Sequence, residues 1–210
     1  MDRDGGAGQR SALLVVDMQN DFCPGGSLAV AHGDSVAGPL NEVAARLAGA
    51  GQPVYASRDW HPAHTRHFAE LGGPWPVHCV ADTPGAAFHP ALRLSPGTVV
   101  VSKGTDTNDD GYSAFEGRDD AGHLLPDLLR RDGVEKLYVG GLATDYCVKA
   151  SVLSALQAGL QVTVLSDAIA AVEVSPGDGD RAIAEMRAAG AQFAVAGEVQ
   201  PDGPAIGADQ

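Results

Sequence analysis

Three observations predict an α/β protein built on a parallel sheet. Six short apolar runs of strand length recur along the chain. Segments with helical spacing, or long crossovers, separate these runs. Several runs are followed directly by residues capable of acid–base or ligand chemistry, as expected where functional groups gather beyond the carboxyl ends of parallel strands. Such a succession is typical of a parallel sheet with both faces covered, so we expect three layers.

The predicted strands are short and mostly apolar. The first, residues 11–17, reads SALLVVD and ends in a carboxylate, as buried parallel strands often do. The sequence favours the remaining strands at residues 53–57, 98–102, 136–140, 161–165 and 192–195.

The predicted helices lie between these strands. Val36, Leu40, Val43 and Leu47 recur at spacings of four, three and four, which indicates an amphipathic helix that ends near residues 49–51. Further helices are expected at residues 124–131, 145–158 and 180–189. We expect one domain over residues 11–196, between flexible tails at residues 1–10 and 197–210.

Composition excludes several classes of protein. The formal charge is −13, from 27 acidic and 14 basic residues, which disfavours nucleic acids and anionic membranes as partners. No apolar run approaches the roughly 20 residues of a membrane-spanning helix, and the polar start lacks a signal-peptide core. We therefore expect a cytoplasmic protein, in which the three cysteines are reduced.

Cys147 is a candidate nucleophile. The run GGLATDYC, residues 140–147, passes from strand through a tight turn to a helix, which Thr144 or Asp145 would cap. Free N–H groups and the positive end of the helix dipole would favour a thiolate there and hold an oxyanion. A buried structural cysteine is the alternative, and position alone favours it.

Two further strand ends carry possible partners for this cysteine. Asp17 ends an apolar strand, where desolvation would raise its pKa toward that of a general base. A helix cap is the ordinary alternative. Lys103, just past the third strand, would hold a carboxylate or thiolate in its ionised form, although an isolated lysine is usually only solvated.

A metal site is the second candidate. Asp59 and His61 lie where the second strand ends, and an extended D-x-H places both side chains on one side. His67 and His78 follow in loops that can fold back. One carboxylate and three imidazoles suit zinc, iron or manganese. Residues 106–111, DTNDDG, begin like a calcium-binding EF-hand loop, but Gly117 stands where its closing glutamate is required.

Taken together, these stretches resemble the nicotinamidase/pyrazinamidase branch of the isochorismatase-like cysteine hydrolases. Six stretches, in the family's order, carry the resemblance: VVDMQNDFCPGGSLAV (15–30), DWHPAHTRHF (59–68), WPVHCVADTPGAAFHP (75–90), SKG (102–104), YSAFEG (112–117) and GLATDYCV (141–148). Tyr146 departs from some relatives, which have histidine there, and the segment before His78 is shorter than in some.

The resemblance implies a strand order of 3-2-1-4-5-6 and a catalytic triad of Asp17, Lys103 and Cys147. It implies a divalent metal, zinc first with iron and manganese as alternatives, and a cis peptide bond between Leu142 and Ala143. The N–H groups of Ala143 and Cys147 would form the oxyanion hole. The implied metal ligands are Asp59, His61, His67 and His78. The implied substrate-binding residues are Phe22, Leu28, Trp75, Tyr112, Leu142 and Tyr146.

The activity implied is hydrolysis of nicotinamide, and of pyrazinamide too, to the acid and ammonia through a cysteine thioester, in NAD salvage. Nicotinamide is then the partner, and a homo-oligomer stays open. One alternative is a metal-free isochorismatase-like hydrolase of another small amide or an enol ether. A second is a non-catalytic metal- or ligand-binding module, which would leave the triad a coincidence.

Overall fold

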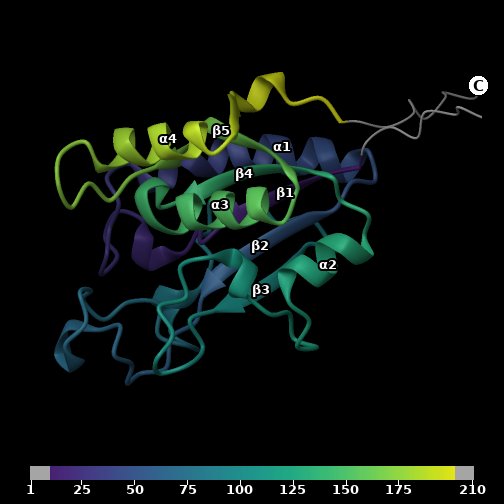
Figure 1. The fold of residues 1–210 in the computed structure, drawn as a ribbon. Helices are drawn as coiled ribbons and strands as arrows, with labels where there is room; N and C mark the ends of the chain where they lie inside the picture. Colours follow the sequence, from purple (N-terminus) through teal and green to yellow (C-terminus); the bar gives the residue numbers. More distant parts are fainter. Residues whose placement is uncertain (1–9, 202–210) are drawn as a thin grey trace, which may run out of the picture.

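The computed structural model describes residues 10–201 and contains a six-stranded parallel sheet with the order β3-β2-β1-β4-β5-β6 (Figure 1). This confirms the predicted fold class and strand order. The strands are β1 (Ser11–Val16), β2 (Val54–Asp59), β3 (Val99–Lys103), β4 (Lys136–Leu142), β5 (Gln161–Ala170) and β6 (Gln192–Ala194). The order reverses between β1 and β4, which pair in register from Ser11 opposite Lys136 to Val16 opposite Gly141.

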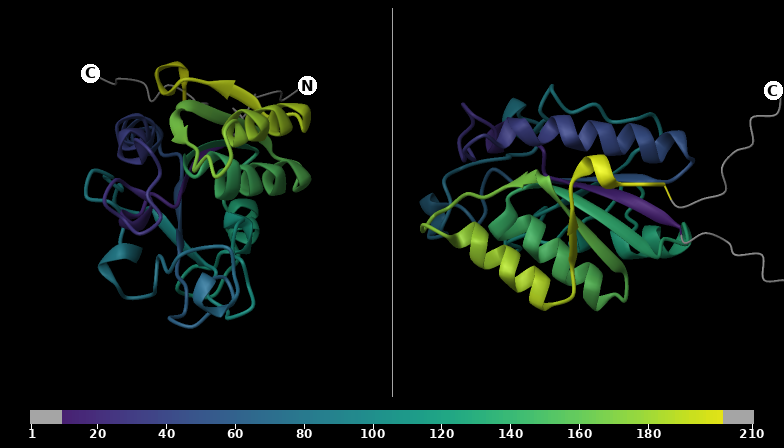
Figure 2. Two further views of the ribbon diagram at one scale, coloured as in Figure 1. Left: turned by 90° about the vertical axis from the view of Figure 1, so that its left-hand side faces the viewer. Right: turned by 90° about the horizontal axis from the view of Figure 1, so that it is seen from above.

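Helices cover both faces of this sheet (Figure 2). They are α1 (Ala37–Gly49), α2 (Leu125–Arg131), α3 (Lys149–Gln157) and α4 (Asp178–Ala188). Side chains of β1 alternate between the two faces, because successive residues of a strand point to opposite sides. Leu13 and Val15 pack with α1, whereas Leu14 and Val16 pack with the other three helices. The expected three layers are therefore present, with a separate core on each face.

The strands on both sides of β1 run further than the sequence pattern indicates. Strand β2 continues to Asp59 and β3 to Lys103, so both polar residues are the last residues of their strands, paired with one another. Strand β5 continues to Ala170, five residues past its apolar run. The apolar pattern misses these ends because polar side chains begin where the strands reach the functional edge of the sheet.

Strands β1 and β4 approach each other unusually closely at their carboxyl ends. Gly141 has a φ of +133°, and a Cβ atom at this position would lie 2.0 Å from the carbonyl oxygen of Val16. Only glycine fits there. The next residue after β1, Asp17, has a φ of +46° and is fully buried, so the chain turns sharply at this carboxylate.

The C-terminal part of the domain extends beyond the predicted boundary at residue 196. Val199 is 1% exposed and belongs to the core beneath α1. The guanidinium of Arg46 donates hydrogen bonds to the carbonyl oxygens of Ala196 and Val199, at 3.0 and 2.7 Å. The segment is therefore held through at least Val199. The rest of both predicted tails, residues 1–9 and 202–210, lies outside the described residues.

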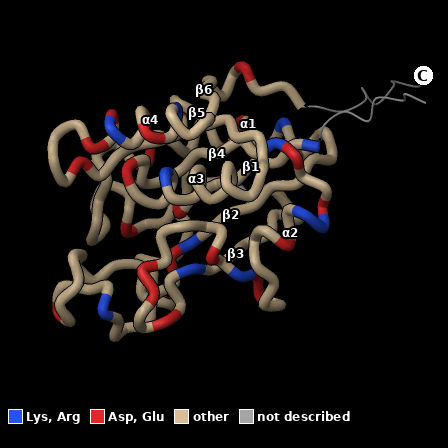
Figure 3. Tube along the Cα trace, in the orientation of Figure 1, with Lys and Arg blue, Asp and Glu red and all other residues tan. Residues whose placement is uncertain are grey.

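Acidic residues are spread over most of the described chain and are interspersed with fewer basic ones (Figure 3). Within residues 10–201, no helix or strand gathers the negative charge, although the loop at residues 104–111 carries three aspartates. Among residues 10–201, no helix combines the length and the apolar character needed to cross a membrane.

Candidate active site

The three side chains of the predicted triad meet at the carboxyl edge of the sheet. Lys103 Nζ lies 2.7 Å from Asp17 Oδ2 and donates a hydrogen bond to Cys147 Sγ at 3.4 Å. All three residues are at least 93% buried, with exposed fractions of 0, 1 and 7% for Asp17, Lys103 and Cys147. The strand order brings them together, because β1 lies between β2 and β4 and Lys103 reaches across from β3.

Burial and charge together set the ionisation of the base. Desolvation raises the pKa of Asp17 to about 6, although Lys103 opposes the shift and Ser57 donates a hydrogen bond of 2.7 Å to Oδ1. Burial disfavours the Lys103 ammonium, but Asp17 and Asp59 outweigh it and raise the lysine pKa well above its usual value. The site therefore holds an ammonium beside a carboxylate that can take up a proton near neutral pH.

The environment of Cys147 differs from the expected helix start. Residues Thr144–Val148 form a π-helical turn before α3, in which Val148 N donates to Ala143 O at 3.0 Å. Burial raises the pKa of the Cys147 thiol well above its usual value, although the Lys103 ammonium lowers it; Asp17 and Asp59 add to the increase. The direction of this shift favours a resting thiol that needs a base, and not the thiolate that a helix start was expected to favour.

Two expectations for the turn before Cys147 have opposite outcomes. The Leu142–Ala143 peptide bond is cis, as predicted. Neither Thr144 nor Asp145 caps the helix. The Asp145 carboxylate instead accepts hydrogen bonds from the N–H groups of Val172 and Glu173, at 2.9 and 3.0 Å, and so ties the turn to the chain beyond β5.

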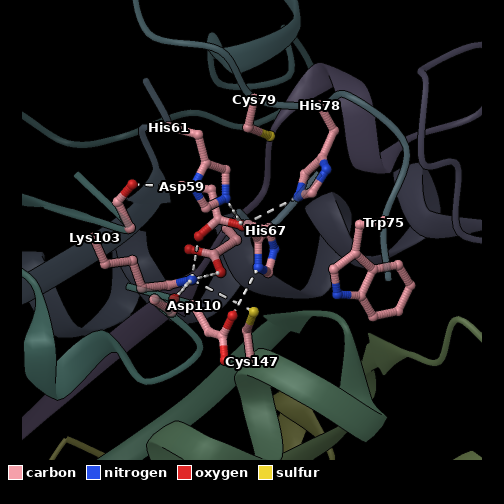
Figure 4. Close-up of polar contacts among 12 residues, drawn as sticks. Asp59, His61, His67, Trp75, His78, Cys79, Lys103, Asp110 and Cys147 are labelled. Atoms are coloured by element: carbon pink, nitrogen blue, oxygen red, sulfur yellow. Dashed lines mark hydrogen bonds and ion pairs between the residues drawn. The ribbon is translucent and has the colours of Figure 1, made fainter. Parts of the chain in front are cut away.

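Three buried histidines form a cluster beside the triad (Figure 4). The ring nitrogens that His61, His67 and His78 can offer lie within 4.8 Å of one another. Asp59 Oδ2 lies 3.6 Å from His61 Nε2 and 3.9 Å from His78 Nε2. All four proposed ligands, scattered over a 20-residue stretch of sequence, are thus gathered at one point.

The hydrogen bonds at Nδ1 decide what each ring presents to the centre of this cluster. His61 Nδ1 contacts Gly104 O at 3.0 Å, and His78 Nδ1 contacts Pro76 O at 2.8 Å. A carbonyl oxygen only accepts, so both Nδ1 atoms carry the hydrogen and both Nε2 atoms carry a lone pair when the rings are neutral. Burial lowers the pKa of His78 to about 4, and that of His67 also falls.

The cluster fits a cation. Neutral rings aim lone pairs at one point, and His61 Nε2 is buried without a hydrogen-bond partner. Burial alone would raise the pKa of Asp59, but Lys103 and His61 lower it, so the carboxylate stays charged. Three imidazole nitrogens and one carboxylate oxygen suit Zn²⁺ and other first-row divalent metals.

Gln19 is a functional residue that the sequence analysis missed. Its buried side-chain amide donates to Asp59 O and Ala86 O, both at 2.8 Å, and its Oε1 accepts from Asp59 N at 2.8 Å. The amide thereby fixes the Asp59 backbone at a level of the sheet that β1, which ends at Val16, no longer reaches. The sequence does show a glutamine two residues after Asp17. Nothing in its neighbourhood indicates its partner, Asp59, which lies 40 residues further along the chain.

An aromatic pocket opens over Cys147. Trp75 Nε1 donates to the Tyr112 hydroxyl at 2.9 Å, and the Trp75 and Tyr146 rings meet edge to face with centroids 4.7 Å apart. Five of the six predicted substrate-binding residues line the pocket. The lining residues are Phe22, Leu28, Asp59, His67, Trp75, His78, Tyr112, Ala143, Tyr146, Cys147 and Val172.

One predicted lining residue points elsewhere, and one lining residue was not predicted. Leu142 is fully buried in the core under α1, where its side chain packs near Gly33. Ala143, which follows the end of β4 across the cis peptide bond, lines the pocket instead. Val172 completes the lining, brought there by the late end of β5.

The fold and site define a class of α/β hydrolase in which a cysteine, a carboxylate and a lysine meet at the carboxyl edge of the sheet. The family model for the isochorismatase domain matches residues 11–197, and the chain belongs to this family.

Three proteins of known name or structure are similar to this chain over most of its length. The nicotinamidase of Escherichia coli (strain K12) is 43% identical over 86% of this chain and 92% of its own length. The zinc-bound pyrazinamidase of Pyrococcus horikoshii superposes with a TM-score of 0.82 at 42% identity, over 89% of this chain and 99% of that one. PnC1 from L. infantum, solved with nicotinate, superposes with a TM-score of 0.81 at 34% identity, over 90% and 94%.

Proposed function

We propose that the protein hydrolyses nicotinamide to nicotinic acid and ammonia, and accepts pyrazinamide, in NAD salvage. The observation that carries this proposal is the position of Cys147: its thiol lies between the Asp17–Lys103 pair and an aromatic pocket that also contains His67 and His78. The relatives named nicotinamidase and pyrazinamidase support the same substrate class.

Asp17 begins the reaction as the general base. Its pKa of about 6 leaves it ionised at neutral pH, ready to take the proton of the buried Cys147 thiol. The thiolate then adds to the carboxamide carbon, and the carbonyl π electrons move to the oxygen. Lys103, in contact with both groups, stabilises the negative charge as it passes from carboxylate to sulfur.

The N–H groups of Ala143 and Cys147 would hold the resulting oxyanion, because both residues line the pocket at the turn that carries the nucleophile. Asp17 then gives its proton to the leaving nitrogen, and ammonia departs as the C–N bond breaks. A water molecule, deprotonated by Asp17, adds to the thioester carbon, the C–S bond breaks to release nicotinic acid, and Asp17 returns the proton to the sulfur of Cys147.

Asp59, His61, His67 and His78 would hold one divalent metal, for which zinc is our first candidate. A metal held there would supply a Lewis acid for the pyridine nitrogen, which would orient the carboxamide toward Cys147. Phe22 and Trp75 would enclose the ring, with Leu28, Tyr112 and Tyr146 beside them. This arrangement disfavours the alternative of a metal-free hydrolase, because it gives no reason for three buried imidazoles to converge on one point.

Ammonia release from the purified protein tests the proposal against a panel of nicotinamide, pyrazinamide, benzamide and an aliphatic amide. We expect turnover of the first two and very little of the others. No ammonia from nicotinamide with zinc, iron or manganese supplied would overturn it. The cytoplasmic location and a possible homo-oligomer remain predictions, which fractionation and light scattering would check.

A further inference from the structure

The acidic segment at residues 104–111, which we call the 104–111 loop, contacts several parts of the site at once. Gly104 O accepts from His61 Nδ1, and Gly111 O accepts from Lys103 Nζ at 2.7 Å. Thr107 O accepts from the N–H of Arg66 and the hydroxyl of Thr65, at 3.1 and 3.2 Å, next to His67. One loop therefore fixes the surroundings of two histidines and of the triad lysine.

Short local hydrogen bonds keep this loop in shape. Asp106 Oδ1 accepts from Asn108 N at 3.0 Å, and Asp109 Oδ1 accepts from Gly111 N at 2.9 Å. The two ends of the loop touch, since a Cβ atom on Gly111 would lie 2.4 Å from Gly104 Cα. A side chain on Gly104 would strike the His61 ring at the same distance. The Asp106 and Asp109 carboxylates thus stabilise the conformation of the loop through hydrogen bonds within it.

Asp110 is different, because its carboxylate leaves the loop and meets a buried ring. Its Oδ1 lies 3.3 Å from His67 Nδ1 (Figure 4). The Asp110 side chain is 67% exposed, whereas that of His67 is 3% exposed, so the carboxylate reaches the ring from the solvent side. The Nδ1 atoms of His61 and His78 face backbone carbonyls, so among the three rings it is His67 whose Nδ1 partner is charged.

We propose that Asp110 is a positioning residue that turns the His67 ring so that Nε2 faces the other metal ligands, and that it thereby strengthens metal binding. The carboxylate accepts only, so Nδ1 keeps its hydrogen and Nε2 keeps its lone pair. A carboxylate behind a metal-bound histidine also makes the ring a stronger ligand, and its loss typically weakens metal affinity 10- to 100-fold. The inference rests on the metal site of the proposed function.

The test measures the dissociation constant for Zn²⁺ by competition with a chromophoric chelator at one pH. We expect Asp110→Ala to bind zinc about 10- to 100-fold more weakly than wild type, and Asp110→Asn, which keeps an acceptor oxygen, to lose less. Asp106→Asn is the matched control: it removes one charge from an exposed position of the same loop and should stay within about twofold. Circular dichroism and thermal melting of the metal-free variants report on folding.

At saturating zinc, Asp110→Ala should regain nearly the kcat of wild type, since Asp110 does not line the pocket. Zinc affinity of Asp110→Ala within twofold of wild type would overturn the inference. An equal loss in Asp106→Asn would also overturn it, because loop charge alone would then explain the effect. A wild-type protein that binds no zinc would overturn this inference but not the activity, which ammonia release tests separately, whereas one that binds zinc without releasing ammonia would overturn the activity alone.

Discussion

Lys103 Nζ lies 2.5 Å from Oδ1 of Asp59, whose other oxygen faces the histidine cluster. The same ammonium group holds Asp17 and contacts Cys147. The triad and the metal site therefore share one buried charged group, the Lys103 ammonium. A substitution in either site should alter the electrostatics of the other. The predictions below follow from this shared arrangement.

Cys147→Ala should lower turnover of nicotinamide by at least about three orders of magnitude, because it removes the atom that forms the thioester. It removes no metal ligand, so bound zinc and the melting temperature should stay close to wild type. Steady-state ammonia release and metal analysis check this. Cys23→Ala, a change in the core under α1, serves as the control and should stay active. Residual Cys147→Ala activity within tenfold of wild type would exclude Cys147 as the nucleophile.

Asp17→Asn should lower kcat by about 10²- to 10⁴-fold, since an amide cannot take up the thiol proton. In the wild type, activity should fall as the pH drops through about 6, because the base works only as a carboxylate and its pKa is raised to about 6. A pH profile of kcat/KM from pH 4.5 to 8 measures this. A flat profile across this range contradicts the assignment.

Ser57→Ala refines the same prediction. Ser57 donates a hydrogen bond to the ionised form of Asp17, which lowers the pKa of the carboxyl group. Its loss should raise that pKa further, so the acid limb of the profile should move to higher pH while the activity at pH 8 is largely kept. An acid limb that stays in place would show that Asp17 does not control it.

Lys103→Met should destabilise the fold as well as stop turnover. The change leaves Asp17 and Asp59 as buried carboxylates without their shared partner, which we expect to cost about 3–5 kcal/mol in the free energy of unfolding. Urea unfolding measures it. Lys149→Met is the control, because its ion pair with Glu185 lies at the surface and should contribute less than about 1 kcal/mol. Equal costs for the two variants would contradict the shared role of Lys103.

Removal of the metal should affect pyridine amides in particular. If the metal grips the ring nitrogen, the loaded enzyme should cleave benzamide far more slowly than nicotinamide, because a site built for a polar atom rejects an analogue lacking it. His61→Ala and His67→Ala should lose metal and nicotinamide turnover together. Comparable rates on both amides, or full activity after chelation, would mean that the metal is structural.

The sequence allowed the fold and most of the site to be predicted because the chemistry lies at strand ends. Asp17 follows an apolar run directly and Asp59 lies two residues past the end of another predicted strand, so local pattern places both at one edge of a parallel sheet. Gln19 and Asp110 could not be found in this way, because their partners lie 40 and 43 residues distant and depend on how loops fold back. The ionisation of Cys147 was also missed, since burial is a property of the whole packed site.

Gly141 gives the site a further property, which concerns how this enzyme can change over evolutionary time. The nucleophile and the base come from chain segments more than a hundred residues apart. Their strands can pair at this close distance because Gly141 has no Cβ atom. A methyl group at position 141 would clash with the backbone of Val16. Relief of this clash would move β1 and β4 apart and increase the distance between Asp17 and Cys147. Selection at position 141 should therefore admit glycine alone, while the aromatic pocket above it remains free to diversify toward other amides.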